Sequence, residues 1–81
     1  MLELNEIISF MKASLASEVN MSASHIDIHK DFFEYGLDSI NAIYFLELIE
    51  REFKLQLSPL YFWDYPTIHS LAVQIQLEID R

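Results

Sequence analysis

The chain contains no cysteine, and it has only one glycine and two prolines among its 81 residues. The absence of cysteine excludes a disulfide framework and any metal site built from thiolates. It fits a reducing compartment, and we expect a cytoplasmic location. No apolar run approaches the ~20 residues of a membrane span. Residues 1–20 lack the basic start and the uninterrupted apolar run of a signal peptide, so we expect none.

Basic residues are also scarce, because 5 Lys and Arg accompany 13 Asp and Glu and the formal net charge is −8. Nucleic acids and anionic membrane surfaces repel such a domain, so we expect neither as a partner. Partners with basic patches are favoured, although an acidic excess also serves solubility alone. Apolar residues make up 52% of the chain, which argues against disorder. We expect residues 1–81 to form a single domain and a monomer.

Apolar residues recur at helical spacing in four segments of the chain. We expect helices over residues 4–18, 39 to 53 or 54, about 59–64 and 67 to about 79. Ser58 followed by Pro59 is typical of a helix start, and Thr67 is a suitable cap for the last helix. Residues 20–38 form a long connection. The predicted fold is therefore all-α, a four-helix bundle with a short third helix and a long loop between the first two helices.

Ser39 lies between the only glycine, Gly36, and the second predicted helix. Gly36 falls where the chain must turn into that helix, so we expect it to have a positive φ, and Asp38 is suited to the N-cap. A serine nucleophile needs a neighbouring base and an oxyanion hole. Nothing in the spacing of the three histidines pairs them with Ser39, and the Gly-x-Ser-x-Gly pattern is absent. We therefore expect no catalysis at Ser39, which by itself could simply begin a helix.

The second predicted helix has two apolar sides. At roughly 100° per residue, one arc collects the residues expected in the core, which are Ala42, Phe45, Leu46, Ile49 and Phe53. The opposite side mixes apolar and charged, mostly acidic, residues, namely Ile40, Ile43, Tyr44, Glu47, Glu50 and Arg51. Large apolar residues on a face that should be solvated indicate a contact surface beside Ser39 and Asp38. Two simpler interpretations stay open: the long loop covers Ile40 or Ile43, and the carboxylates are merely solvated.

Two segments of the chain, residues 31–40 and 57–72, carry recognisable motifs. The first is Asp31-Phe-Phe-Glu-Tyr-Gly-Leu-Asp-Ser-Ile40. The second is Leu57-Ser-Pro-Leu-Tyr-Phe-Trp-Asp-Tyr-Pro-Thr-Ile68, followed by Ser70-Leu-Ala72. They resemble the attachment-site segment and the third helix, with its following connection, of polyketide-synthase-type acyl carrier proteins. The resemblance to these phosphopantetheine-binding carrier domains covers about residues 26–79, and the two segments together are far more specific than a lone Asp-Ser pair.

The resemblance implies a covalent modification. A phosphopantetheinyl transferase would move 4′-phosphopantetheine from coenzyme A to the Ser39 hydroxyl, and the thiol of this arm would carry acyl groups as thioesters. The protein would itself catalyse nothing and would bind no metal. Ketosynthase, acyltransferase and tailoring enzymes with basic docking patches would act on the cargo in polyketide or related fatty-acyl biosynthesis. The residues expected to dock these partners are Asp38, Ile40, Ile43, Tyr44, Glu47 and Glu50.

Details of the motif separate the polyketide type from its relatives. Leu37 before Asp38 fits the polyketide pattern better than the Gly-Gly-x-Ser of peptidyl carriers or the Gly-Ala-Asp-Ser of bacterial fatty-acid carriers. Phe45 stands where carriers of β-branching polyketide cassettes often have Trp, which disfavours that role. For Trp63 and Tyr61 we expect core packing rather than contact with an acyl chain or a partner. The alternatives are a peptidyl carrier domain of a nonribosomal peptide synthetase and an unmodified helical protein-interaction module.

Overall fold

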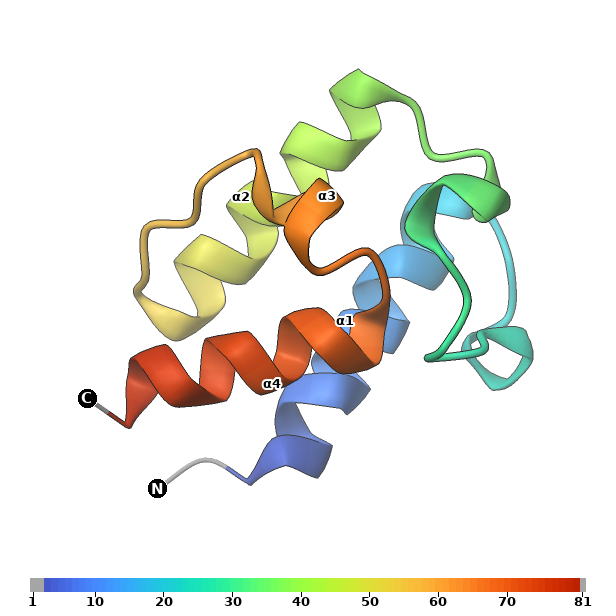
Figure 1. Ribbon diagram of the computed structural model, residues 1–81. Helices are drawn as coiled ribbons and strands as arrows, with labels where there is room; N and C mark the ends of the chain where they lie inside the picture. Colours follow the sequence, from blue (N-terminus) through green and yellow to red (C-terminus); the bar gives the residue numbers. More distant parts are fainter. Residues whose placement is uncertain (1–2, 81) are drawn as a thin grey trace.

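The computed structural model describes residues 3–80, in which helices surround a shared apolar core (Figure 1). The helices are α1 (Leu4–Val19), α2 (Ser39–Phe53), the short α3 (Tyr61–Asp64) and α4 (Ile68–Ile79). Two 3₁₀ turns, η1 (Ala23–His25) and η2 (Phe32–Tyr35), lie in the connection from α1 to α2. The described residues contain no strand. The predicted all-α fold with a short third helix and a long first loop is confirmed.

The limits of the longer helices follow local signals in the sequence. The side chain of Asp38 accepts a hydrogen bond from the backbone N–H of Asn41 at 2.8 Å, which caps α2 as predicted. Thr67 caps α4 by accepting from the N–H of Ser70 at 3.1 Å. α1 ends at Asn20, whose φ of 59° is left-handed. These contacts involve neighbours in the sequence, which is why the limits could be predicted.

The third helix is shorter than the prediction of residues 59–64. The side chain of Ser58 accepts a hydrogen bond from the N–H of Leu60 at 3.1 Å, so it closes a turn rather than capping an α-helix. The N–H of Tyr61 then donates to the carbonyl of Ser58 at 3.0 Å, three residues back. Such i to i+3 bonds wind the chain more tightly than an α-helix. The α-helical turn therefore begins only at Tyr61.

The core is formed by the inner faces of α1, α2 and α4, and Figure 1 shows α4 crossing α1 with α3 beside α2. Among residues 3–80, no polar or charged residue is buried. The predicted core face of α2 is confirmed for Ala42, Phe45, Leu46 and Ile49. Phe53, at the end of this face, is half-buried and packs edge-on against Phe10, with ring centroids 5.4 Å apart. None of the helices in the described part of the chain has the length and the apolar character required to cross a membrane.

The long connection is fastened to the rest of the fold and then turns toward α2. Phe32 is buried, and its N–H donates to the carbonyl of Pro66 at 2.8 Å. The hydroxyl of Tyr35 accepts from the N–H of Asp27 at 2.7 Å and donates to the carbonyl of the same residue at 2.8 Å. Gly36 ends η2 with a φ of 82°, which confirms the expected positive value. The turn at Gly36 leads the chain directly to the start of α2.

Candidate functional site

Ser39 is the first residue of α2 and its side chain is exposed. Within residues 3–80 its hydroxyl has no hydrogen-bond partner, because the cap of α2 is the carboxylate of Asp38. If Ser39 were itself the cap of the helix, its hydroxyl oxygen would accept a hydrogen bond from a backbone N–H of the first turn. The hydroxyl of Ser39 is therefore free to react with a group brought from outside.

Ser39 borders an apolar pocket between η2, α2 and α3, with a volume of about 150 Å³. The lining residues are Phe33, Ser39, Ala42, Ile43, Pro59, Phe62 and Trp63. Among the described residues that line it there is no histidine, carboxylate or lysine, so the pocket offers no base to activate the serine. The described lining therefore lacks the base that a serine hydrolase requires.

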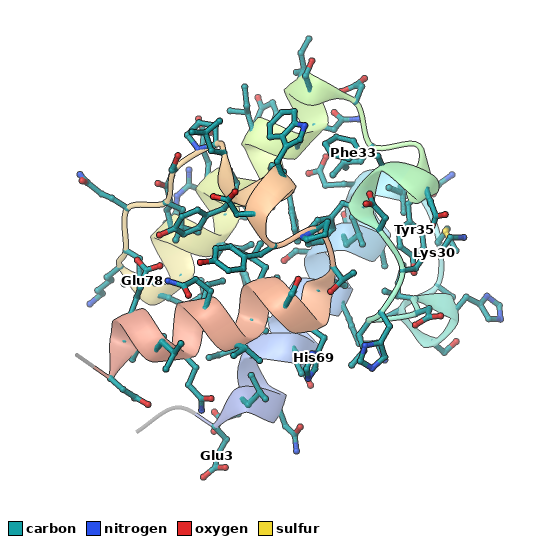
Figure 2. All side chains as sticks on the ribbon, in the orientation of Figure 1. Glu3, Lys30, Phe33, Tyr35, His69 and Glu78 are labelled. Atoms are coloured by element: carbon teal, nitrogen blue, oxygen red, sulfur yellow. The ribbon has the colours of Figure 1, made fainter. Side chains whose placement is uncertain are left out.

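Two of the three histidines lie together at another place. The rings of His29 and His69 are 4.9 Å apart between centroids, where the long connection meets the start of α4. His69 is labelled in Figure 2. No group of three or more potential metal ligands occurs in residues 3–80. This pair belongs to neither the pocket nor a candidate metal centre.

The outer face of α2 is open to solvent beside Ser39. Ile40 is 69% exposed, Ile43 is 51% exposed, and Tyr44 and Glu47 are also exposed. The alternative in which the long loop covers Ile40 or Ile43 is therefore wrong. The loop instead buries Ile26 and Phe32 in the core, on the other side of α2.

Glu50 differs from the other acidic residues of this face. It is half-buried, and its carboxylate accepts a hydrogen bond from the N–H of Leu57 at 2.7 Å. This contact holds the link after α2 against the helix and buries Leu57. The sequence alone did not indicate this contact, because the two residues are seven positions apart across a turn. A docking role for Glu50 stays a prediction, and its carboxylate already has an internal partner.

The expected core packing of Trp63 is wrong, because Trp63 is 69% exposed. α3 makes a single turn, so only one large side chain can point straight into the core, and that side chain is Phe62. Trp63 points outward and its ring lies 5.8 Å from that of Phe33. Figure 2 shows Phe33 on η2. Tyr61 packs against the core and is half-buried, as expected.

Acidic side chains surround this apolar region. Between positions 31 and 50 the charged residues are Asp31, Glu34, Asp38, Glu47 and Glu50, while Lys30 and Arg51 lie at the two ends of this stretch. Asp64 on α3 is also exposed. An apolar centre with a mainly negative border is complementary to an apolar surface edged by Lys or Arg.

A comparison with protein families finds one match over most of the chain. The model described as "Phosphopantetheine attachment site" matches residues 9–75. Polyketide synthase PksN of Bacillus subtilis (strain 168) is 32% identical over 75 residues, which are 93% of this chain and 1% of that protein. The chain thus spans about one hundredth of the length of this relative.

Solved structures of single carriers resemble the chain over nearly its whole length. A free-standing peptidyl carrier protein from an uncharacterized secondary metabolic pathway of Acinetobacter baumannii is 34% identical, with a TM-score of 0.90. The match covers 95% of this chain and 96% of that one. The HMG-ACPI domain of the CurA module from Lyngbya majuscula is 30% identical, with a TM-score of 0.87. That match covers 95% of this chain and 78% of that one.

Proposed function

The chain belongs to the phosphopantetheine attachment site family of non-catalytic carrier proteins, and we propose that Ser39 is the residue to which 4′-phosphopantetheine is attached. The observation that carries this assignment is the free, exposed hydroxyl of Ser39 at the start of α2, in the part of the chain that matches the family. The arm supplies, when bound, the thiol that a chain without cysteine lacks.

The start of α2 suits the phosphodiester that this reaction creates. The Ser39 oxygen forms a bond to the pantetheine-bearing phosphorus of coenzyme A, and the pyrophosphate bond breaks. Adenosine 3′,5′-bisphosphate leaves, while the serine proton passes to a base of the transferase. The new phosphate carries a negative charge at the positive end of the dipole of α2, where unpaired backbone N–H groups favour an anion.

The modification is tested by intact mass measurement after incubation with coenzyme A and a promiscuous phosphopantetheinyl transferase. We expect one phosphopantetheine adduct on the wild-type protein and none on Ser39→Ala. Ser17→Ala serves as the matched control, because Ser17 is also exposed and helical, and it should be modified like the wild type. If a known carrier is modified in the same tube and this protein is not, Ser39 is not an attachment site. The outer face of α2 would then belong to an unmodified interaction module.

We further infer that the cargo is an acyl intermediate of polyketide or related fatty-acyl biosynthesis. The Leu37-Asp38-Ser39 sequence and the similarity to a polyketide synthase support this cargo. A peptidyl cargo is the second candidate, favoured by the similarity to a free-standing peptidyl carrier protein. Mass spectrometry of the protein from its native host distinguishes them, because an acyl thioester and an aminoacyl thioester differ in composition.

We propose that the outer face of α2 docks the transferase first and then ketosynthase, acyltransferase and tailoring enzymes. The residues proposed to contact these partners are Asp38, Ile40, Ile43, Tyr44, Glu47 and Glu50. Of these, Glu50 already accepts a hydrogen bond from the N–H of Leu57. Exposed apolar side chains would supply contact area while the acidic border steers a basic partner. Such successive complexes are expected to have low affinity and small interfaces. We also propose that residues 1–81 act as one carrier domain and as a monomer.

Charge reversal tests the docking face. Glu47→Lys should raise the KM of the transferase for this protein several-fold, and added salt should shrink the difference from wild type. Glu52→Lys is the matched control, because Glu52 is exposed on the same helix but lies about 140° around the axis from Glu47. Equal kinetics of the two variants would refute the choice of face.

A further inference from the structure

The position of α3 depends on contacts with the rest of the fold. A helix of one turn is not stable alone, and Leu60, which precedes it, provides no side-chain cap. One anchor is Phe62, which is 2% exposed and packs edge-on against Phe32 with ring centroids 5.2 Å apart. Phe62 fixes the place of this short helix, and its rotation about that ring is set by the contacts of the residues on either side, Tyr61 and Trp63. The contact of Tyr61 therefore bears on which way Trp63 points.

The second anchor is a hydrogen bond to α4. The hydroxyl of Tyr61 donates to the carboxylate of Glu78 at 2.9 Å, across a separation of 17 residues. The amide of Gln74 donates to the same carboxylate oxygen at 3.0 Å from one turn earlier in α4. Glu78 is labelled in Figure 2, near the C-terminal end of α4. The hydrogen bond from Gln74 thus helps to orient the acceptor toward Tyr61. A bond to an ionised group is also stronger than one between neutral groups.

The arrangement of α3 places this bond opposite the exposed tryptophan. Tyr61 and Trp63 are two residues apart, so their side chains leave the helix roughly 200° from each other. Phe62 lies between them and points into the core. A bond that holds Tyr61 against α4 therefore holds Trp63 against Phe33 on the other side, where both line the pocket at Ser39.

We propose that Tyr61 is a positioning residue whose hydrogen bond to Glu78 sets the rotation of α3 and thereby holds Trp63 in the wall of the pocket beside Ser39. The hydrogen bond to Glu78, followed by burial and the charge of Glu78, raises the pKa of Tyr61, so the donor proton is retained. The effect on modification rests on the proposed function of Ser39. The effect on Trp63 does not, because it concerns the unmodified protein.

The tryptophan itself reports the test, because Trp63 is the only one in the chain and gives a single indole N–H signal by NMR. In Tyr61→Phe we expect this signal to shift and broaden. Tyr65→Phe is the matched control, since the Tyr65 ring packs edge-on against Tyr61 with centroids 5.2 Å apart. The hydroxyl of Tyr65 has no hydrogen-bond partner within residues 3–80, so its removal should leave the indole signal in place.

The acceptor is tested separately. Glu78→Gln keeps an oxygen that can accept from the Tyr61 hydroxyl, so it should move the indole signal less than Glu78→Ala does. All spectra are taken well below the unfolding midpoint of the least stable variant, so that global unfolding does not contribute. An indole signal in Tyr61→Phe that superimposes on wild type would overturn the proposal. So would an equal shift in Tyr65→Phe.

The effect on modification is measured by the kinetics of the same transferase with coenzyme A. Tyr61 and Glu78 are both half-buried, so solvent screening keeps the contribution of their bond at the lower end, a change of about 3- to 10-fold in an equilibrium. Tyr61→Phe should therefore raise the KM for this protein by about that factor. The kcat should stay within about twofold, because the Ser39 hydroxyl itself is unaltered. A shifted indole signal with an unchanged KM would overturn the link from Tyr61 to Ser39. Failure of the wild-type protein to accept the arm would instead reject the modification of Ser39, and the NMR result would still decide the role of Tyr61.

Discussion

Substitution of Asp38 separates two roles that one carboxylate combines. Its oxygen accepts a hydrogen bond from the N–H of Asn41 at 2.8 Å, and its charge lies next to Ser39 on the proposed docking face. Asp38→Ala removes both the cap and the charge. Asp38→Asn keeps an oxygen that can cap the helix and removes only the charge, because Asn is as good an N-cap as Asp.

The two changes should differ in stability. Loss of an N-cap costs about 1 kcal/mol, and loss of a negative charge at a helix N-terminus costs about 0.3–1 kcal/mol. Asp38→Ala should therefore lower the free energy of unfolding by about 1.5 kcal/mol, and Asp38→Asn by about 0.5 kcal/mol. In a domain of this size 1 kcal/mol shifts the Tm by about 4–8 °C, so the expected losses are about 6–12 °C and about 2–4 °C.

Thermal unfolding followed by circular dichroism measures the stability, and transferase kinetics at low salt measure the docking. We expect both variants to lose a similar factor in kcat/KM, because both lack the charge. Glu52→Gln, which removes one charge from the last turn of the same helix, should keep the wild-type kcat/KM. If Asp38→Asn melted as early as Asp38→Ala, the capping argument would fail. Wild-type kinetics in Asp38→Asn would show that partners do not sense this charge.

Other parts of the fold can be perturbed with similar precision. Gly36→Ala should lower the free energy of unfolding in urea by about 1–2 kcal/mol, because Gly36 has a φ of 82°, which residues with a Cβ rarely adopt. Nothing lies within 4 Å of an added Cβ, so unchanged stability would refute this backbone strain. Tyr35→Phe should cost about 1–2 kcal/mol and speed hydrogen exchange at Asp27, since two hydrogen bonds of 2.7 and 2.8 Å are lost. The pKa of Tyr61 is raised in the folded protein, mainly by its bond to Glu78, so its phenol ionises first in the unfolded chain. From neutral pH to about pH 10 the stability advantage of the wild type over Tyr61→Phe should therefore be constant, and above about pH 10 it should shrink. An advantage that grew between about pH 10 and higher pH would contradict the assignment.

Features controlled by near neighbours in the chain were predictable. The apolar periodicity located α1, α2 and α4, and the caps at Asp38 and Thr67 bond residues only three positions away. The left-handed turn at Gly36 follows from the only glycine in the chain. Ser39 could be singled out as the candidate attachment residue because its motif occupies a few consecutive residues.

Features that depend on contacts between distant segments of the chain could not be predicted from the sequence. The sequence places Trp63 in an apolar run where core packing is the ordinary expectation, yet in the single turn of α3 Phe62 is the buried side chain and Trp63 points outward. The bonds of Glu50 to the Leu57 N–H and of Tyr61 to Glu78 cross between elements, and no local pattern marks them.

By itself, the sequence determined that the protein is an acidic all-α domain with a serine presented at the start of its second helix. Periodicity, capping and turn formation are local, so they act through residues that lie near one another in the chain. Only the tertiary structure decided what surrounds that serine. Phe33, Ile43 and Trp63 come from three different elements, and the pocket they share with Ser39 exists only once η2, α2 and α3 have packed against the same core.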